Sequence, residues 1–570
     1  MGHAKVGENA AVSPRIRLVL DALAGFALSF AIVEGFRISV AGGTGVFGIR
    51  SFAAFVALGA LLGAGLCWLG GFLDAHPLRP AQPLTRAQRR RHAWIAFAVI
   101  LVGWFPVFLA AFPGFFDYDA GVDYLMQWGQ IESGQLNSHH PILHTLYLEA
   151  TVEAGQALFG SFNAGVAVSV GIQALLVAAA LAAVLRWLLS VGMGRVGFWA
   201  SVAYLALDPI VACFAFATTK DVMFSACVVL WCALLGQLYR LTASGAKADW
   251  RHLAQVAIGI ALLGFFIGAL RSNALVAFAI IVPVLLVVVR GHGRVVLLAS
   301  MAVAVVFVCI VLGPVSSALN VEKSPIGKWN ALSVPIQQIA RCSVDPSVSE
   351  EDKAAIDEVA PGMVYGDGLS DYARSAWGED EPEKIDAFLS LYRHLGRAYP
   401  AVYFDAFLYQ TQDAWSPFSI IDEGNYDGEP GATSIFEATQ KPPATPDSKF
   451  PALLDALRTI GYTDALARVP VAGMIVSVWP YLFALGLALV RALVRRDRCA
   501  LVVLVPLAVI ALSVLFGPAV LIRYYLYLFF GLPLIVWLSV RPLPARQAEG
   551  GGAPGRVAAR AKEGSSRARA

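Results

Sequence analysis

The chain has 570 residues, of which 58% are hydrophobic and only 15% are charged, and its mean hydropathy is +0.65. This composition excludes an ordinary soluble globular protein and is typical of a polytopic membrane protein. The net charge of +3 gives no indication of nucleic-acid binding, because the charges are sorted by region along a largely apolar chain.

Apolar runs close to twenty residues long can cross a hydrocarbon core roughly 30 Å thick. The chain contains about twelve of them. They are residues 18–40, 51–73, 93–111, 164–189, 196–217, 222–241, 254–270, 274–289, 295–318, 471–494, 500–519 and 524–540. The expected fold is therefore all-α and polytopic, with transmembrane helices 1 to 9 in residues 1–319 and helices 10 to 12 in residues 471–541.

Every second connection between these runs is rich in Lys and Arg, from the amino-terminal segment to the basic tail of residues 542–570. Basic connections are typically cytoplasmic. Both ends of the chain are therefore expected in the cytoplasm of a multi-pass cell-membrane protein, and the Gly- and Arg-rich tail is expected to be disordered. The alternate connections, including residues 320–470, are expected on the extracytoplasmic side.

Residues 320–470 form a long polar insert with roughly twice as many acidic as basic residues. Residues 383–415, interrupted near Pro400, and residues 451–467 have helical apolar spacing, which predicts a mainly helical domain. Its only cysteine is Cys342, so it has no internal disulfide. The insert also carries aromatic residues that could either stack on sugars or form its core. Those singled out are Trp377, Tyr409, Trp415 and Tyr426.

The loop of residues 112–146 concentrates acidic and His side chains between two apolar runs. Asp119 is the candidate general base, because the neighbouring aromatic residues would partly desolvate its carboxylate, and Asp117 is the rival. Either residue could instead cap the helix expected near Ala120. His139 and His140 are candidate substrate ligands. A divalent metal held by one of them with Asp119 stays open, although the spacing matches no strong metal motif and no cofactor is certain.

Charged side chains next to a bilayer are functional candidates, and several are expected at one membrane face. Lys220 and Asp221 lie between the fifth and sixth runs, Arg271 lies between the seventh and eighth, and Arg523 begins the twelfth. Each could be an interfacial anchor. Lys and Arg usually prefer the cytoplasmic side, so Lys220, Arg271 and Arg523 together on the extracytoplasmic side are unusual. A phosphate at headgroup level would account for them.

The segments PGFFDYDAGVDYLMQ, SHHPILHTL, TTKD, RSN and RYYLYL resemble the polytopic GT-C glycosyltransferases, in particular a bacterial branch with a Pro-Gly, Asp and His-His-Pro pattern in its first external loop. The resemblance covers most of the membrane region but not the insert. It implies a glycosyltransferase that moves a sugar from a polyprenyl-phosphate donor to a cell-envelope acceptor on the extracytoplasmic side.

By this resemblance, Asp119 matches the loop carboxylate that activates the acceptor, and Lys220, Arg271 and Arg523 match the donor-phosphate contacts by location. Asp221, Asn273 and Tyr524 belong to the same motifs and complete the substrate-binding set with His139 and His140. Many relatives have an adjacent acidic pair where this chain has Asp117-Tyr118-Asp119. A transporter or flippase for a lipid-linked glycan, and a binding or scaffold protein that uses the insert, are the alternatives.

Overall fold

The computed structural model describes most of the chain, and the account that follows is confined to that part. The described residues are 13–41, 48–76, 78, 82–116, 136–138, 140–243, 249–271, 273–322, 329, 331–366, 370–374, 376, 382–418, 444–462 and 473–541. They fold into helices, joined in this part of the chain by one pair of two-residue strands and an isolated β-bridge.

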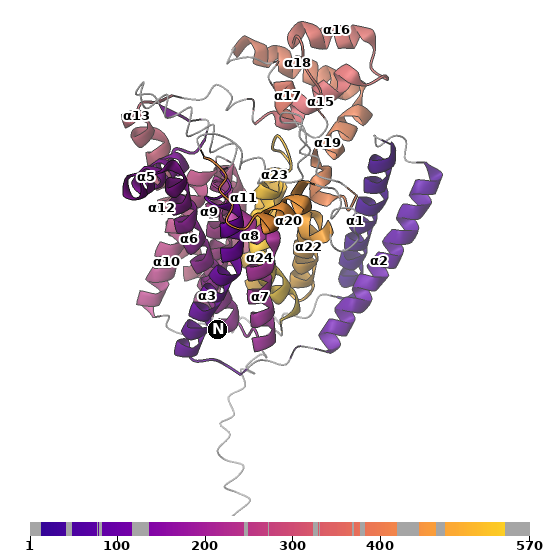
Figure 1. Cartoon of the computed structure of the whole chain (residues 1–570). Coiled ribbons are helices and arrows are strands. Elements are labelled where there is room, and N and C mark those ends of the chain that lie inside the picture. Colours follow the sequence, from indigo (N-terminus) through magenta and orange to yellow (C-terminus); the bar gives the residue numbers. More distant parts are fainter. Residues whose placement is uncertain are drawn as a thin grey trace, which may run out of the picture.

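Helices before and after the insert form a bundle (Figure 1). Those before it are α1 (Pro14–Ala41), α2 (Ile49–Ala75), α3 (Arg86–Ala111), α5 (Ile142–Phe159), α6 (Phe162–Ser190), α7 (Arg195–Leu207), α8 (Pro209–Ala215), α9 (Lys220–Ala243), α10 (Trp250–Leu270), α11 (Ala274–Val288), α12 (His292–Ile310), the π-helical η1 (Val311–Val315) and α13 (Ser316–Ala318). Those after it are the short η4 (Gly473–Val476), α22 (Trp479–Val494), α23 (Arg498–Val514) and α24 (Ile522–Val540).

Within the described residues, eight helices are long and apolar enough to cross a membrane, and the number becomes nine if the bent α7–α8 pair is one span. The protein is therefore a polytopic membrane protein. Three of the predicted crossings correspond to the shorter helices α11, α22 and α23, which have 15, 16 and 17 residues. The total of about twelve crossings stays a prediction.

The fifth predicted crossing is broken in the middle, where α7 and α8 meet at an angle of 59°. Pro209 lacks the amide hydrogen that would continue the hydrogen bonding of α7. Asp208 stands at the break and accepts a hydrogen bond from the amide of Val211 at 2.9 Å, so it caps the second helix. Residues 196–217 are therefore one continuous apolar run in the sequence but form two helices with different directions.

Helices α9 and α24 lie at the centre of the bundle. Of the most apolar stretch of each, 67% and 78% of the residues are buried, more than in the other long spans. Helix α9 packs against α6, α10, α23 and α24. We call the end of the bundle that carries the insert the insert face. The first turns of α9 and α24 both lie there, because chain connectivity places them at the same end as the carboxyl end of α12.

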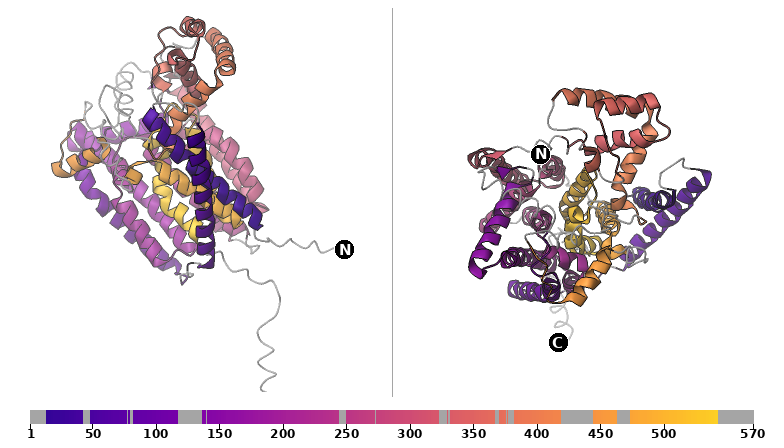
Figure 2. Two further views of the ribbon diagram at one scale, coloured as in Figure 1. Left: turned by 90° about the vertical axis from the view of Figure 1, so that its right-hand side faces the viewer. Right: turned by 45° about the horizontal axis from the view of Figure 1, so that its top comes forward.

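Helices α1 and α2 form a hairpin beside the bundle (Figures 1 and 2). The two helices pack closely, because a Cβ atom on Gly25 would lie only 2.2 Å from the nitrogen of Gly63. At the end away from the insert, Asp74 of α2 forms ion pairs with Arg17 of α1 at 3.2 Å and with Arg491 of α22 at 3.0 Å. The second of these ion pairs joins the hairpin to the bundle.

The described part of the insert is helical and stands on the bundle (Figure 2). Its helices are α15 (Ser333–Val344), α16 (Glu350–Val359), α17 (Ser370–Arg374), α18 (Pro382–Ala398), α19 (Pro400–Trp415) and α20 (Pro451–Tyr462). The first five surround their own apolar core, which includes Trp329, Ile336 and Phe388. The predicted interruption near Pro400 is confirmed, since α18 ends and α19 begins there.

Two contacts connect the insert to the ends of the 112–146 loop. Strand β1 (Leu136–Asn137) pairs in parallel with β2 (Val321–Glu322), where the insert begins. At the other end of the insert, the amides of Asp447 and Lys449 donate to the carbonyls of Phe112 and Leu109 at 3.0 and 2.8 Å. The insert is thus attached where the candidate loop leaves the bundle and where it returns.

Candidate functional site

The segment before α9 is fixed against the start of the 112–146 loop. The amide of Phe115 donates to the carbonyl of Phe216, and the amide of Thr218 donates to the carbonyl of Phe115, both at 2.9 Å. The buried side-chain amide of Gln173 in α6 donates to the carbonyl of Ala217 at 2.7 Å. These bonds hold the first turn of α9, with Lys220, beside the point where the loop departs.

Asp221 is a fully buried carboxylate with two guanidinium groups near it. Arg271, which follows α10, approaches it with Nη1 at 2.9 Å from Oδ1. Arg523, in the first turn of α24, has Nε at 3.9 Å from Oδ2, a distance that makes an ion pair and not a hydrogen bond. Because an uncompensated buried charge costs several kcal/mol, the carboxylate and the guanidinium groups stabilise one another at this position.

Aromatic rings enclose these guanidinium groups. The Cζ of Arg271 lies 4.3 Å from the ring centroid of Tyr524 and 5.6 Å from that of Phe224. The Cζ of Arg523 lies 5.2 Å from the same Tyr524 ring. Stacking on the ring fixes the plane of a guanidinium group and limits its hydration, which prepares it for a planar, charge-assisted contact.

His140 lies next to the first turn of α9. Its Nδ1 is 3.0 Å from Nζ of Lys220, and the ammonium group donates this hydrogen bond when the imidazole is neutral. The contact brings the end of the 112–146 loop to the start of α9, although the two residues are far apart in sequence. We call Lys220, Asp221, Arg271, Arg523 and Tyr524 the Asp221 group, and His140 borders it.

Asn273 follows Arg271 by two residues, in the connection between α10 and α11. It is the residue before α11, and its side-chain amide donates to the hydroxyl of Ser513 in α23 at 3.4 Å. This bond joins two helices of the bundle. Among the contacts of the described residues, Asn273 is therefore a connection between α11 and α23 near the Asp221 group.

Three predicted site residues, Asp117, Asp119 and His139, lie outside the described residues. The described residues contain no cluster of three or more His, Cys, Asp or Glu side chains that could hold a metal ion. The metal hypothesis depends on Asp119, so it stays a prediction.

Sequence reasoning missed three residues that shape the site. Gln173 fixes the turn before α9, and the hydroxyl of Thr219 lies 3.3 Å from Oδ2 of Asp221. Phe224 stacks near Arg271. The sequence held a signal for Phe224, because it follows Asp221 by one helical turn and so shares its face of α9. The sequence held no such signal for Gln173, which is a polar residue within an apolar run.

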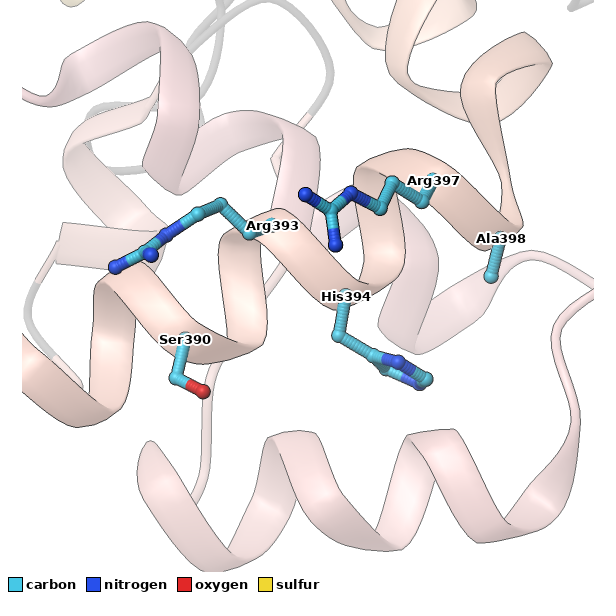
Figure 3. A pocket seen from close by; sticks show the side chains of 5 residues that line it. All are labelled: Ser390, Arg393, His394, Arg397 and Ala398. Carbon is cyan, nitrogen blue, oxygen red and sulfur yellow. The ribbon is translucent and has the colours of Figure 1, made fainter.

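A surface pocket lies on α18 of the insert, away from the Asp221 group (Figure 3). It is lined by Ser390, Arg393, His394, Arg397 and Ala398. The side chain of His394 is largely exposed and already contacts Asp352 at 2.8 Å. None of the predicted site residues that the structure describes lines it, and it is open to solvent, so the chemistry of the site is better sought at the Asp221 group.

No curated protein and no solved structure matches the chain. Residues 124–550 match the model of DUF6020, described as a family of unknown function. The match covers the Asp221 group, His140 and the whole insert. It spans well over half of the chain, and the protein therefore belongs to the DUF6020 family.

Proposed function

We propose that the protein is a membrane glycosyltransferase that moves a sugar from a polyprenyl-phosphate donor to an extracytoplasmic cell-envelope acceptor. The observation that carries the proposal is the Asp221 group. Three cationic side chains, from the starts of α9 and α24 and the end of α10, gather at the insert face, and Tyr524 stacks on two of them. A lipid-linked phosphate at headgroup level is the ligand whose charge and depth match this arrangement.

The cations would act on the leaving group. When the acceptor hydroxyl attacks the anomeric carbon, the bond to the phosphate oxygen breaks and negative charge grows on the lipid phosphate. Arg271 and Arg523 donate hydrogen bonds to that charge more strongly in the transition state than in the bound donor. Asp221 keeps both guanidinium groups in place before the donor arrives.

The acceptor proton requires a base, which we assign to Asp119 of the 112–146 loop. The support is indirect: described residues at both ends of this loop lie at the Asp221 group, with Phe115 bonded to Thr218 and His140 bonded to Lys220. A carboxylate in the intervening segment is therefore within a short stretch of chain of the phosphate-binding cations.

The proposal needs the insert face on the extracytoplasmic side, as the basic connections at the other end of the helices indicate. Cysteine labelling of intact cells tests this orientation. In a chain whose exposed Cys309 is replaced by Ser, Glu351→Cys on α16 should react with a membrane-impermeant maleimide. Labelling of Glu351→Cys only after the cells are opened would contradict the orientation and the proposed function with it.

Transfer is tested with the purified protein and a set of polyprenyl-phosphate sugars, by measuring release of polyprenyl phosphate as the sugar passes to water or to an added cell-envelope acceptor. Wild type should release it, and Arg523→Ala should need a higher donor concentration. Arg251→Ala is a matched control, since Arg251 also lies against an aromatic ring, that of Trp250 at 5.6 Å, but at the opposite end of α10. No release with any donor of the set would count against the glycosyltransferase.

A transporter for a lipid-linked glycan is the second candidate, and the bent α7–α8 pair favours it, because broken helices are common at transporter binding sites. The two functions separate in a vesicle assay. A transporter moves an intact labelled donor lipid between leaflets without cleaving it, whereas the proposed enzyme cleaves the donor and leaves its leaflet unchanged.

A further inference from the structure

The turn between α23 and α24 is held by the insert. The side-chain amide of Gln410 in α19 donates to the carbonyl of Gly517 at 2.7 Å. The amide and hydroxyl of Ser370, the first residue of α17, both donate to the carbonyl of Pro518, at 3.0 and 3.2 Å. Ser370 and Gln410 are 0% and 1% exposed, so these bonds are shielded from water. We call Ser370 and Gln410 the clamp residues.

The clamped turn leads directly into the Asp221 group. Pro518 is followed shortly by Ile522, where α24 begins, and then by Arg523 and Tyr524. A helix that starts from a fixed turn has a fixed axial position and rotation, which sets the direction of the side chains in its first turn. The clamp therefore acts on one of the two arginines near Asp221, and on the ring that stacks on both.

The two clamp residues belong to one body within the insert. Arg341 of α15 forms an ion pair with Asp405 of α19 at 2.9 Å, which joins α15 to the helix of Gln410. Gln337 of α15 donates to the carbonyl of Gly366 at 2.6 Å, just before the helix of Ser370. A displacement of α15 would thus move both clamp residues together, and with them the turn.

We propose that Ser370 and Gln410 are positioning residues that couple the insert to the donor-phosphate site through the 516–518 turn. This inference rests on the proposed function and adds a regulatory property to it. When the insert holds the turn, Arg523 and Tyr524 are oriented for the phosphate. Because coupling between two binding events is reciprocal, an acceptor that binds the insert and steadies it raises donor affinity, and the donor raises acceptor affinity by the same factor.

Donor binding by the full-length protein in detergent tests the clamp, with a short-chain polyprenyl phosphate as the probe. The clamp variant Ser370→Ala/Gln410→Leu should bind the probe about three- to tenfold more weakly, the effect expected from losing one or two net hydrogen bonds that order the site. Ser349→Ala is the control, because the Ser349 hydroxyl bonds within the insert to Asp352 of α16 at 2.9 Å and, among the contacts of the described residues, touches neither the turn nor the helices of the clamp residues. The control should bind like wild type.

The same substitutions in a protein that already carries Arg523→Ala distinguish an effect on the orientation of Arg523 from a general loss of rigidity. If the clamp acts through Arg523, the clamp variant should lose no further affinity when Arg523 is already Ala, because effects within one coupled unit are not additive. Equal losses in both backgrounds, or unchanged binding in the clamp variant, would overturn the inference. If the clamp variant does not fold, Ser370→Ala alone serves, since the backbone bond to Pro518 remains.

Binding of the probe by the wild-type protein separates failure of the proposed function from failure of the inference. Wild-type protein that does not bind the probe overturns the proposed function, and the inference with it. Wild-type protein that binds the probe, loses affinity on Arg523→Ala and is indifferent to the clamp variant retains the proposed function and loses the inference alone.

Discussion

The substitution Asp221→Asn removes a carboxylate that the two arginines share, and its effect on stability follows from the burial of the site. Asp221 is 0% exposed at its side chain, and the side chains of Arg271 and Arg523 are 14% and 10% exposed. Removing one member of a buried ion pair typically costs about 3–5 kcal/mol, because the remaining charge stays buried without a partner. The amide keeps the shape and can still accept one hydrogen bond, so we expect a loss near the lower limit, about 3 kcal/mol.

The free energy of unfolding in detergent, from reversible denaturation, measures this loss. Asp447→Asn is the control, since that carboxylate is about half exposed and should change stability by less than about 0.5 kcal/mol. A double-mutant cycle with Arg271→Gln should give a coupling energy of about 1–3 kcal/mol, because the double variant removes both charges of the 2.9 Å pair. Additive effects of the two substitutions would refute the ion pair as a source of stability.

Three further outcomes are expected. Arg523→Ala should weaken donor binding by about 10- to 100-fold, as expected for one charge-assisted contact to phosphate, and unchanged affinity would make Arg523 a membrane anchor. At saturating donor, Asp119→Asn should lower turnover by about 10²- to 10⁴-fold and Asp117→Asn by less, and the reverse order would make Asp117 the base. In the insert, a hydrogen bond from Tyr399 lowers the pKa of Asp352 below its ordinary 3.8, so the stability that this bond adds is present above that value and is lost as the pH falls through the lowered pKa. An acid titration followed by circular dichroism should show less of this loss in Asp352→Asn than in wild type.

The fold could be predicted where the signal is local. Pro400 ends one amphipathic helix and begins the next, and the structure confirms that break, because apolar spacing on both sides restricts where the helices can start. The break at Asp208 and Pro209 also contains a proline, but the apolar pattern of the sequence did not predict it. Hydropathy averages over a window, and residues 196–217 are apolar apart from Ser201 and Asp208, so the average hides a change in backbone direction.

The sequence can predict at which end of the bundle the charged residues lie, but not which of them contact one another. Alternation of the crossings places Lys220, Arg271 and Arg523 at one end of the bundle. In the structure Arg271 and Arg523 both approach Asp221, and Lys220 is the residue before it. Which carboxylate faces which cation depends on how α9, α10 and α24 rotate against one another, and that rotation is set by side-chain packing between distant segments. The contact of His140 with Lys220 is of this kind, and so is the bond from Gln410 to Gly517.

The family match begins inside the 112–146 loop. Residues 124–550 include the Asp221 group, both clamp residues and the insert, whereas α1, α2, α3 and the proposed base Asp119 lie outside them. Arg271 and Arg523 both approach Asp221 of α9, Phe224 of α9 lies near Arg271, and the 516–518 turn before α24 accepts hydrogen bonds from the insert. The insert is thus bonded to the turn just before α24. The hairpin contacts the insert as well, because α1 packs against α19 and Ile38 clusters with Leu408 and Tyr409. At the far end of the bundle the hairpin reaches α22 through Asp74 and Arg491. Sequence changes in the insert, and changes in α1 where it packs against α19, thus both have a short physical path to the turn that precedes Arg523 and Tyr524.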